Sequence, residues 1–138
     1  MVFVLGAREA FKIVYIISCS KKLASIQILE DENRIKQVIA NLVDNAIKFT
    51  EEGMISVSVE IGPRYDCVVV KVKDTGSGID KEILPRLFTK FATKSDTTGT
   101  GLGLFIAKSI VEAHRGKIWA EDNRDGRGAT FVLSLLID

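Results

Sequence analysis

The chain has 138 residues, of which 46% are apolar and 27% charged, proportions that are typical of a globular domain and exclude a wholly disordered chain. Nineteen Lys and Arg side chains against eighteen Asp and Glu give a net charge of +1, which excludes the strongly basic field of many nucleic-acid-binding proteins. One histidine and two widely separated cysteines exclude a zinc site of the usual kind and favour reduced thiols over a disulfide framework.

The length predicts one domain over residues 1–138. The secondary structure of its first thirty residues is ambiguous from the sequence. Phe11–Ser20 is apolar and rich in β-branched residues, as a strand is, but it is also long enough for a buried helix. It is too short for the roughly 20 residues of a membrane span, and Lys12 interrupts it. Both the strand and the helix stay open for this segment.

The next part of the chain predicts a long helix over Asp31–Phe49. Asp31 is a suitable N-cap, and apolar residues recur at helical spacing through the segment. A strand with alternating apolar side chains is predicted at Met54–Ile61, and a turn leads into a second strand at Cys67–Lys73. These two strands are predicted to form a hairpin.

Two further helices and a second hairpin complete the predicted order. A short helix starts at Asp80, and a longer one runs over Leu102–His114 and stops at Gly116. Lys117–Asp122 and Ala129–Leu136 are predicted to pair across a turn. Hairpins grouped apart from helices predict an α+β fold, a two-layer sandwich whose mixed, mainly antiparallel sheet is covered on one face by helices.

Three polar side chains lie in one stripe along the edge of the long helix's apolar face: Asn41, Asn45 and Lys48. An amide oxygen is a suitable ligand for Mg²⁺, and a lysine is a point charge that suits a phosphate. The stripe predicts one wall of a polar cleft, although solvated residues at a helix boundary show the same pattern.

Two glycine-containing segments add to this prediction. Asp74–Ile79 directly follows a strand, where a carboxylate can accept a hydrogen bond from an exocyclic amine such as that of adenine; an ordinary turn is the alternative. Gly99–Leu104 opens a helix, where free backbone N–H groups can bind phosphate. It is not a dinucleotide fingerprint, because the third glycine is replaced by Leu104, and not a P-loop, because no Gly-Lys-Ser/Thr is present. Lys90–Thr98 is small, polar and basic, as expected of a lid over phosphates.

Five segments in chain order resemble the sequence boxes of sensor histidine kinases. The asparagine box, first glycine box, phenylalanine box, second glycine box and closing glycine segment correspond to residues 41–49, 74–79, 86–91, 99–104 and 126–130, at the spacings usual in that family. The match covers about residues 31–136. The chain therefore resembles the catalytic, ATP-binding domain of a two-component sensor histidine kinase, which implies the Bergerat ATP-binding fold.

The resemblance implies ATP and Mg²⁺ as ligands and a role for each matching residue. Asn45 matches the asparagine that coordinates Mg²⁺, Asn41 assists it, and Lys48 matches a lysine that contacts phosphate; these three are the implied catalytic residues. Asp74 matches the carboxylate that recognises the amine of adenine. The other implied nucleotide contacts are Phe49, Gly76, Gly78, Ile79, Lys94, Gly99, Thr100, Gly101, Leu102, Gly103, Leu104 and Thr130.

The implied function is transfer of the γ-phosphoryl group of Mg-ATP to a histidine on a separate dimerisation and phosphoacceptor helix domain, in two-component signal transduction. Related hydrolysing ATPases carry a glutamate at the position of Asn41, and an amide cannot act as the base that activates water. His114 matches a structural position at a helix end, so the phosphoacceptor is expected outside this chain. A same-fold ATPase or protein-serine kinase, and a nucleotide-binding interaction module without turnover, are the alternatives.

The resemblance also implies partners and a location. The expected partners are the dimerisation helices of a parent kinase and, indirectly, a response regulator, with no nucleic acid. The isolated domain is expected to be a cytoplasmic monomer, and membrane attachment of the parent stays open. The first thirty residues are short for the strand, helix and strand that the family places there, so Met1–Leu5 and Ala24–Leu29 are candidate strands with a short helix between them.

Overall fold

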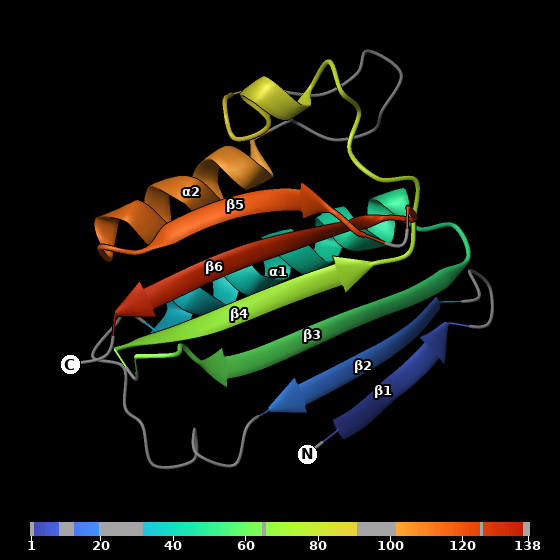
Figure 1. The fold of residues 1–138 in the computed structure, drawn as a ribbon, viewed down its shortest axis with the longest axis horizontal. Helices are drawn as coiled ribbons and strands as arrows, with labels where there is room; N and C mark the ends of the chain where they lie inside the picture. Colours follow the sequence, from blue (N-terminus) through green and yellow to red (C-terminus); the bar gives the residue numbers. More distant parts are fainter. Residues whose placement is uncertain are drawn as a thin grey trace.

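A computed structural model describes residues 2–8, 13–19, 32–64, 66–90, 102–124 and 126–136. The elements in these ranges alternate between groups of strands and single helices, as Figure 1 shows. In chain order they are β1 (Val2–Arg8), β2 (Ile13–Cys19), α1 (Glu32–Phe49), β3 (Gly53–Ile61), β4 (Cys67–Asp74), the single 3₁₀ turn η2 (Leu84–Arg86), α2 (Gly103–Ala113), β5 (Lys117–Asp122) and β6 (Ala129–Leu136).

The strands in the described part of the chain form one six-stranded sheet with the order β1-β2-β3-β4-β6-β5. Strands β2 and β3 run parallel, and the other four neighbouring pairs are antiparallel. Helices α1 and α2 pack against each other and against the same face of the sheet, with α1 behind β4 and β6 in Figure 1. The predicted α+β fold, with a mixed and mainly antiparallel sheet covered on one face, is confirmed.

The core between the two layers explains why α1 is held rigidly. Val38, Leu42 and Ala46 recur every fourth residue on α1, and none of them is exposed to solvent. They share one hydrophobic cluster with sheet residues that include Val72 and Leu133. Fully burying a Val or Leu side chain stabilises a fold by roughly 1.5–3 kcal/mol. The polar stripe of α1 therefore lies beside a fixed, buried row.

The alternation of β4 determines where Asp74 lies. Every second residue of this strand is buried, and the series Val68, Val70, Val72 ends at Asp74. Successive side chains of a strand point to opposite faces, so these four point to the face that the helices cover. An apolar strand thus carries a carboxylate at its last position into the interior between the two layers.

Most of the predicted elements are present with bounds that differ by one or two residues, but the short helix from Asp80 is wrong. The chain forms turns there and a single 3₁₀ turn at Leu84–Arg86. Pro85 lies inside the predicted segment and lacks the N–H group that a longer helix would need. Phe88 still packs on the sheet, edge-on to Phe131 with 6.3 Å between ring centres.

The amino-terminal strands resolve one open question. The strand interpretation of Phe11–Ser20 is confirmed by β2, and the candidate strand Met1–Leu5 corresponds to the longer β1. A helix between the two candidate strands is wrong for Ile13–Cys19, because these residues pair with β1 and β3. Ala24–Leu29 lies outside the described residues. No helix in the described ranges is long and apolar enough to cross a membrane.

Candidate functional site

The polar stripe of α1 contacts the start of α2. Asn41 is half-buried, and its Nδ2 donates a hydrogen bond to the carbonyl oxygen of Gly103, 3.2 Å away. Gly103 is the first residue of α2 and belongs to the second glycine box. Asn45 is half-buried one turn further along, and the exposed Lys48 has its Nζ 5.7 Å from the centre of the Phe49 ring. The fold therefore brings the asparagine box and the second glycine box together.

The Asp74 carboxylate is held by one of its two oxygens. Asp74 is 2% exposed, and its Oδ1 accepts hydrogen bonds from the backbone N–H groups of Gly76, at 2.9 Å, and Ala129, at 3.3 Å. Burial raises the pKa of Asp74 above its ordinary value, and the two backbone hydrogen bonds oppose that rise. Within the described residues Oδ2 takes no hydrogen bond, so this oxygen remains available to a donor from a ligand.

The backbone after Asp74 passes very close to two other segments, which only glycine permits. A Cβ atom at Gly76 would overlap the carbonyl oxygen of Phe49, which also accepts a 3.2 Å hydrogen bond from the N–H of Ser77. A Cβ atom at Gly128 would overlap the carbonyl oxygen of Asp74, and Gly128 has a φ of +79°, in the left-handed region that favours glycine. The first glycine box therefore lies between the end of α1 and the β5–β6 turn.

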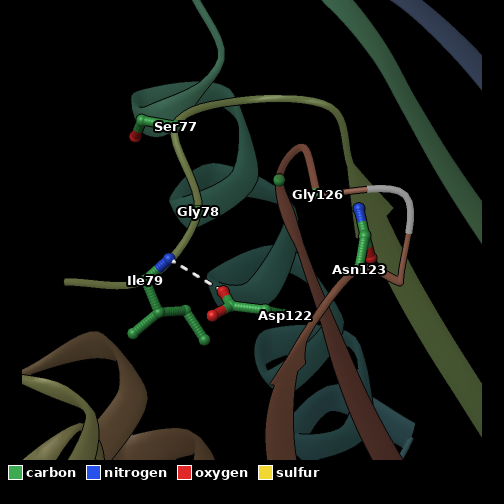
Figure 2. A pocket seen from close by; sticks show the side chains of 7 residues that line it. Ser77, Gly78, Ile79, Asp122, Asn123 and Gly126 are labelled. Atoms are coloured by element: carbon green, nitrogen blue, oxygen red, sulfur yellow. Dashed lines mark hydrogen bonds between the residues drawn. The ribbon is translucent and has the colours of Figure 1, made fainter. Parts of the chain in front are cut away.

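The β5–β6 turn supports the first glycine box with two side chains. Asn123 is buried; its Nδ2 donates to the carbonyl oxygens of Asp74 and Arg127, both at 2.7 Å, and its Oδ1 accepts a 2.5 Å hydrogen bond from the hydroxyl of Thr130. The exposed Asp122 accepts a 3.3 Å hydrogen bond from the N–H of Ile79, drawn as a dashed line in Figure 2. Sequence reasoning did not single out Asp122 or Asn123.

A small cavity of about 180 Å³ lies between the first glycine box and this turn (Figure 2). It contains Gly78 and Ile79 of the predicted site, and no residue of α1 lines it. Its lining residues are Ser77, Gly78, Ile79, Asp122, Asn123, Gly126 and Gly128. The described part of the chain holds no group of three His, Cys, Asp or Glu side chains able to bind a metal ion together.

The remaining predicted residues fall into three groups. Ile79 and Leu104 both pack against the core cluster, so apolar side chains from the two glycine boxes border the same interior. Thr130 is buried, and its hydroxyl donates a hydrogen bond to Oδ1 of Asn123. The predicted contacts Lys94, Gly99, Thr100 and Gly101 lie outside the described residues.

The start of the predicted lid is fixed to α2. The Nζ atom of Lys90 lies 5.1 Å from the centre of the Phe105 ring, within the range of a cation–π interaction. Leu102, the first described residue after the lid, immediately precedes α2 and is half-buried. The described residues on either side of residues 91–101, Lys90 and Leu102, therefore both lie at the amino-terminal part of α2.

Comparison with known proteins agrees with the predicted family. Residues 30–138 match the sequence model of the family described as histidine kinase-, DNA gyrase B-, and HSP90-like ATPase. The sensor protein FixL of Bradyrhizobium diazoefficiens is 42% identical over 110 residues, which cover 78% of this chain and 21% of FixL. The chain spans about a fifth of the length of the relatives it matches.

Two solved structures share both fold and sequence with the chain. The nucleotide-free catalytic domain of histidine kinase ThkA superposes with a TM-score of 0.77 at 34% identity, covering 91% of this chain and 81% of that one. Full-length ShkA in complex with AMPPNP gives a TM-score of 0.73 at 30% identity, covering 88% of this chain and 25% of that one. The resemblance to the catalytic domains of sensor histidine kinases is thereby confirmed.

Proposed function

Because the chain belongs to the family of histidine kinase-, DNA gyrase B- and HSP90-like ATPases, we propose that it binds Mg-ATP and transfers the γ-phosphoryl group to a histidine of a separate helical domain. Two observations carry this proposal together: the carboxylate of Asp74, in the first glycine box, is held by Oδ1 alone, and the position on α1 that contacts the second glycine box is an amide, Asn41. The first suits recognition of adenine, and the second suits transfer without hydrolysis.

Asp74 recognises the base in this proposal. With Oδ1 held by two backbone N–H groups, Oδ2 can accept a hydrogen bond from the exocyclic amine of adenine. A base with a carbonyl in place of the amine would put its oxygen, an acceptor, against Oδ2, which is also an acceptor. Each buried polar group left without a partner weakens binding by about 1–3 kcal/mol. Gly76 serves the site by letting the backbone after Asp74 pass close to the Phe49 carbonyl. The proposed apolar neighbours of the ring are Phe49 and the two residues that border the core, Ile79 and Leu104.

The phosphates bind along the edge of α1 and the start of α2. Asn45 fits Mg²⁺ because its half-buried amide oxygen is a hard, neutral donor on a rigid helix, and Asn41 lies one turn earlier. When bound, Mg²⁺ supplies positive charge that offsets the charge of the phosphates. Lys48 contributes a further cation, and the proposed role of Lys94 and residues 99–104 is to cover the phosphates as a lid and its hinge.

Transfer to histidine needs no protein base. The unprotonated nitrogen of a neutral imidazole attacks the γ-phosphorus, a nitrogen–phosphorus bond forms, and the bond to the bridging oxygen breaks with ADP as the leaving group. The proton on the other ring nitrogen then leaves to solvent. Hydrolysis instead requires a base that takes a proton from water. The Nδ2 of Asn41 donates to Gly103, and an amide oxygen has no useful basicity, so this position favours transfer over hydrolysis.

The whole-protein context is part of the proposal. Residues 1–138 form one catalytic domain of a longer cytoplasmic or membrane-attached kinase, whose dimerisation helices carry the phosphoacceptor and whose response regulator receives the phosphoryl group next. The support is the chain's share of about a fifth of its relatives' length.

The test uses the purified 138-residue chain with ATP labelled at the γ-phosphate and, in one arm, a purified dimerisation and phosphoacceptor domain of a sensor histidine kinase. We expect acid-labile label on the added domain and little release of inorganic phosphate. Release of phosphate without label transfer would indicate an ATPase, acid-stable label would indicate a serine kinase, and binding with neither would indicate an interaction module. Each of those three outcomes contradicts the proposal.

A further inference from the structure

We propose that Asn123 and Thr130 are positioning residues for Asp74, and that the buried hydrogen-bond chain through them determines the preference for adenine over other bases. This inference rests on the proposed function, because it assumes that Asp74 contacts the base. It concerns Asn123, on the turn between β5 and β6, and Thr130, at the start of β6, and it assigns Thr130 an indirect place in recognition.

Asn123 holds the backbone of Asp74 from a position 49 residues away in the sequence. Its side chain is 8% exposed, and both hydrogens of its amide are used, one for the carbonyl oxygen of Asp74 and one for that of Arg127, each at 2.7 Å. Carbonyl oxygens only accept hydrogen bonds, so the amide nitrogen must face them. The orientation of the Asn123 amide is therefore determined by its surroundings.

Thr130 fixes the other end of that amide. Its hydroxyl donates a 2.5 Å hydrogen bond to Oδ1 of Asn123, in a buried environment. The β4–β6 register pairs Thr130 with the exposed Lys73 and pairs Phe131, which lies in the core, with Val72. Thr130 and the side chain of Asp74 therefore point to opposite faces of the sheet. Thr130 acts on Asp74 through Asn123.

The same turn also orients the carboxylate itself. The N–H of Ala129, the residue before Thr130, donates to Oδ1 of Asp74 at 3.3 Å, while Gly128 lets the turn approach the Asp74 carbonyl closely. The turn thus fixes the backbone of Asp74 through Asn123 and its side chain through Ala129. A shift of the turn moves both, and the free Oδ2 then loses the position from which it would meet an amine.

Thr130→Val tests this inference, because it removes the hydroxyl and keeps the branched shape. We expect the Kd for ATP to rise about tenfold, in line with the loss of the hydrogen bond between Oδ2 of Asp74 and the adenine amine, while the Kd for inosine triphosphate changes less than about twofold. Inosine triphosphate has a carbonyl where adenine has its amine, so it does not use Oδ2. Thr130→Ser keeps the hydroxyl and should keep the ATP preference.

The outcomes separate this inference from the proposed function. If the unsubstituted chain binds ATP and inosine triphosphate equally, the base-reading role of Asp74 is wrong. If the unsubstituted chain prefers ATP and Thr130→Val keeps that preference, or weakens both nucleotides equally, Thr130 is only structural and the inference is wrong. Should Thr130→Val not fold, Thr130→Ala removes the same hydroxyl with less bulk and is read in the same way.

Discussion

At the scale of single residues, Asp74 combines a cost to folding with a use in binding. A carboxylate that is 2% exposed loses hydration, which raises its pKa, and two backbone N–H groups recover only part of that loss. An asparagine would accept the same two hydrogen bonds without carrying a charge. A charged group at this position therefore lowers stability, and the proposed contact with adenine accounts for its presence.

The raised pKa of Asp74 predicts opposite pH trends for stability and for binding. The pKa of Asp74 is higher in the folded than in the unfolded chain, so at pH values between these two pKa values the folded chain binds more protons. The free energy of unfolding therefore increases as the pH falls through the folded-state pKa. ATP affinity should fall over the same window, because a protonated carboxyl offers its amine partner a weaker acceptor. ATP titrations and thermal unfolding at a series of pH values would measure both trends.

Asp74→Asn provides the control for these pH trends. It should bind ATP weakly at every pH, without the acid-dependent change, and should unfold at an equal or higher temperature than the unsubstituted chain at neutral pH. A substituted chain that retained both ATP affinity and its pH dependence would show that another group is responsible.

Asn45→Ala should raise the Kd for Mg-ATP at least about tenfold. Substitution of residues that only hydrogen-bond to metal ligands already lowers metal affinity by about 10–100-fold, and Asn45 is proposed as a ligand itself. The physical reason is loss of an amide oxygen that suits Mg²⁺ from the polar stripe of α1. Asp44→Ala, which changes an exposed neighbour on the same helix, is the control and should bind normally. Circular dichroism would verify that both variants are folded. Normal Mg-dependent binding by a folded Asn45→Ala chain would contradict this assignment.

At the scale of elements, the site depends on contacts between α1 and α2. The two helices pack against each other over the sheet, and Asn41 adds a directional hydrogen bond to the first residue of α2. The Nζ atom of Lys90, the first residue of the predicted lid, lies over the Phe105 ring of the same helix. The start of α2 therefore contacts both the asparagine box and the first residue of the lid.

Asn41→Ala should lower the free energy of unfolding by about 1 kcal/mol, the usual net value of one partly buried hydrogen bond. Urea unfolding with an unchanged slope would measure the loss. Ser109→Ala is a matched control on α2, because the exposed Ser109 hydroxyl bonds only to the carbonyl oxygen of Phe105 one turn earlier. Equal stability of Asn41→Ala and the unsubstituted chain would show that the contact with Gly103 contributes nothing.

The sequence predicted the elements whose signals are local. Helical spacing predicted α1 to within one residue, and alternation predicted β3. The turns at residues 62–66 and 123–128 predicted β4 and the hairpin of β5 and β6. The failure at Asp80 has a local cause too, because Pro85 outweighed the apolar spacing. Asn123 could not be found this way: asparagine is ordinary in a turn, and its partner Asp74 is 49 residues distant. Only the β4–β6 register shows that the two meet.

At the scale of the whole molecule, helix α2 has one end in the candidate site and the other end away from it. Its first residue contacts Asn41 in the candidate site, and His114 follows its last residue. His114 is 11 residues after Gly103, so at a rise of about 1.5 Å per residue it lies about 16 Å further along the helix axis. Its Nδ1 is 2.7 Å from the carbonyl oxygen of Ile110. A carbonyl oxygen only accepts hydrogen bonds, so Nδ1 carries the hydrogen and donates the bond.

The chain alone should therefore neither phosphorylate itself nor hydrolyse ATP rapidly. Phosphoryl transfer requires the reacting atoms about 3–3.5 Å apart, and His114 is held at the opposite end of α2 from Gly103, beside which the phosphates are proposed to bind. Labelled ATP incubated with the chain should leave no acid-labile label on it at any protein concentration, and His114→Gln should leave the ATP Kd unchanged. Label that increases with protein concentration and disappears in His114→Gln would instead show transfer between two copies, with His114 as the acceptor.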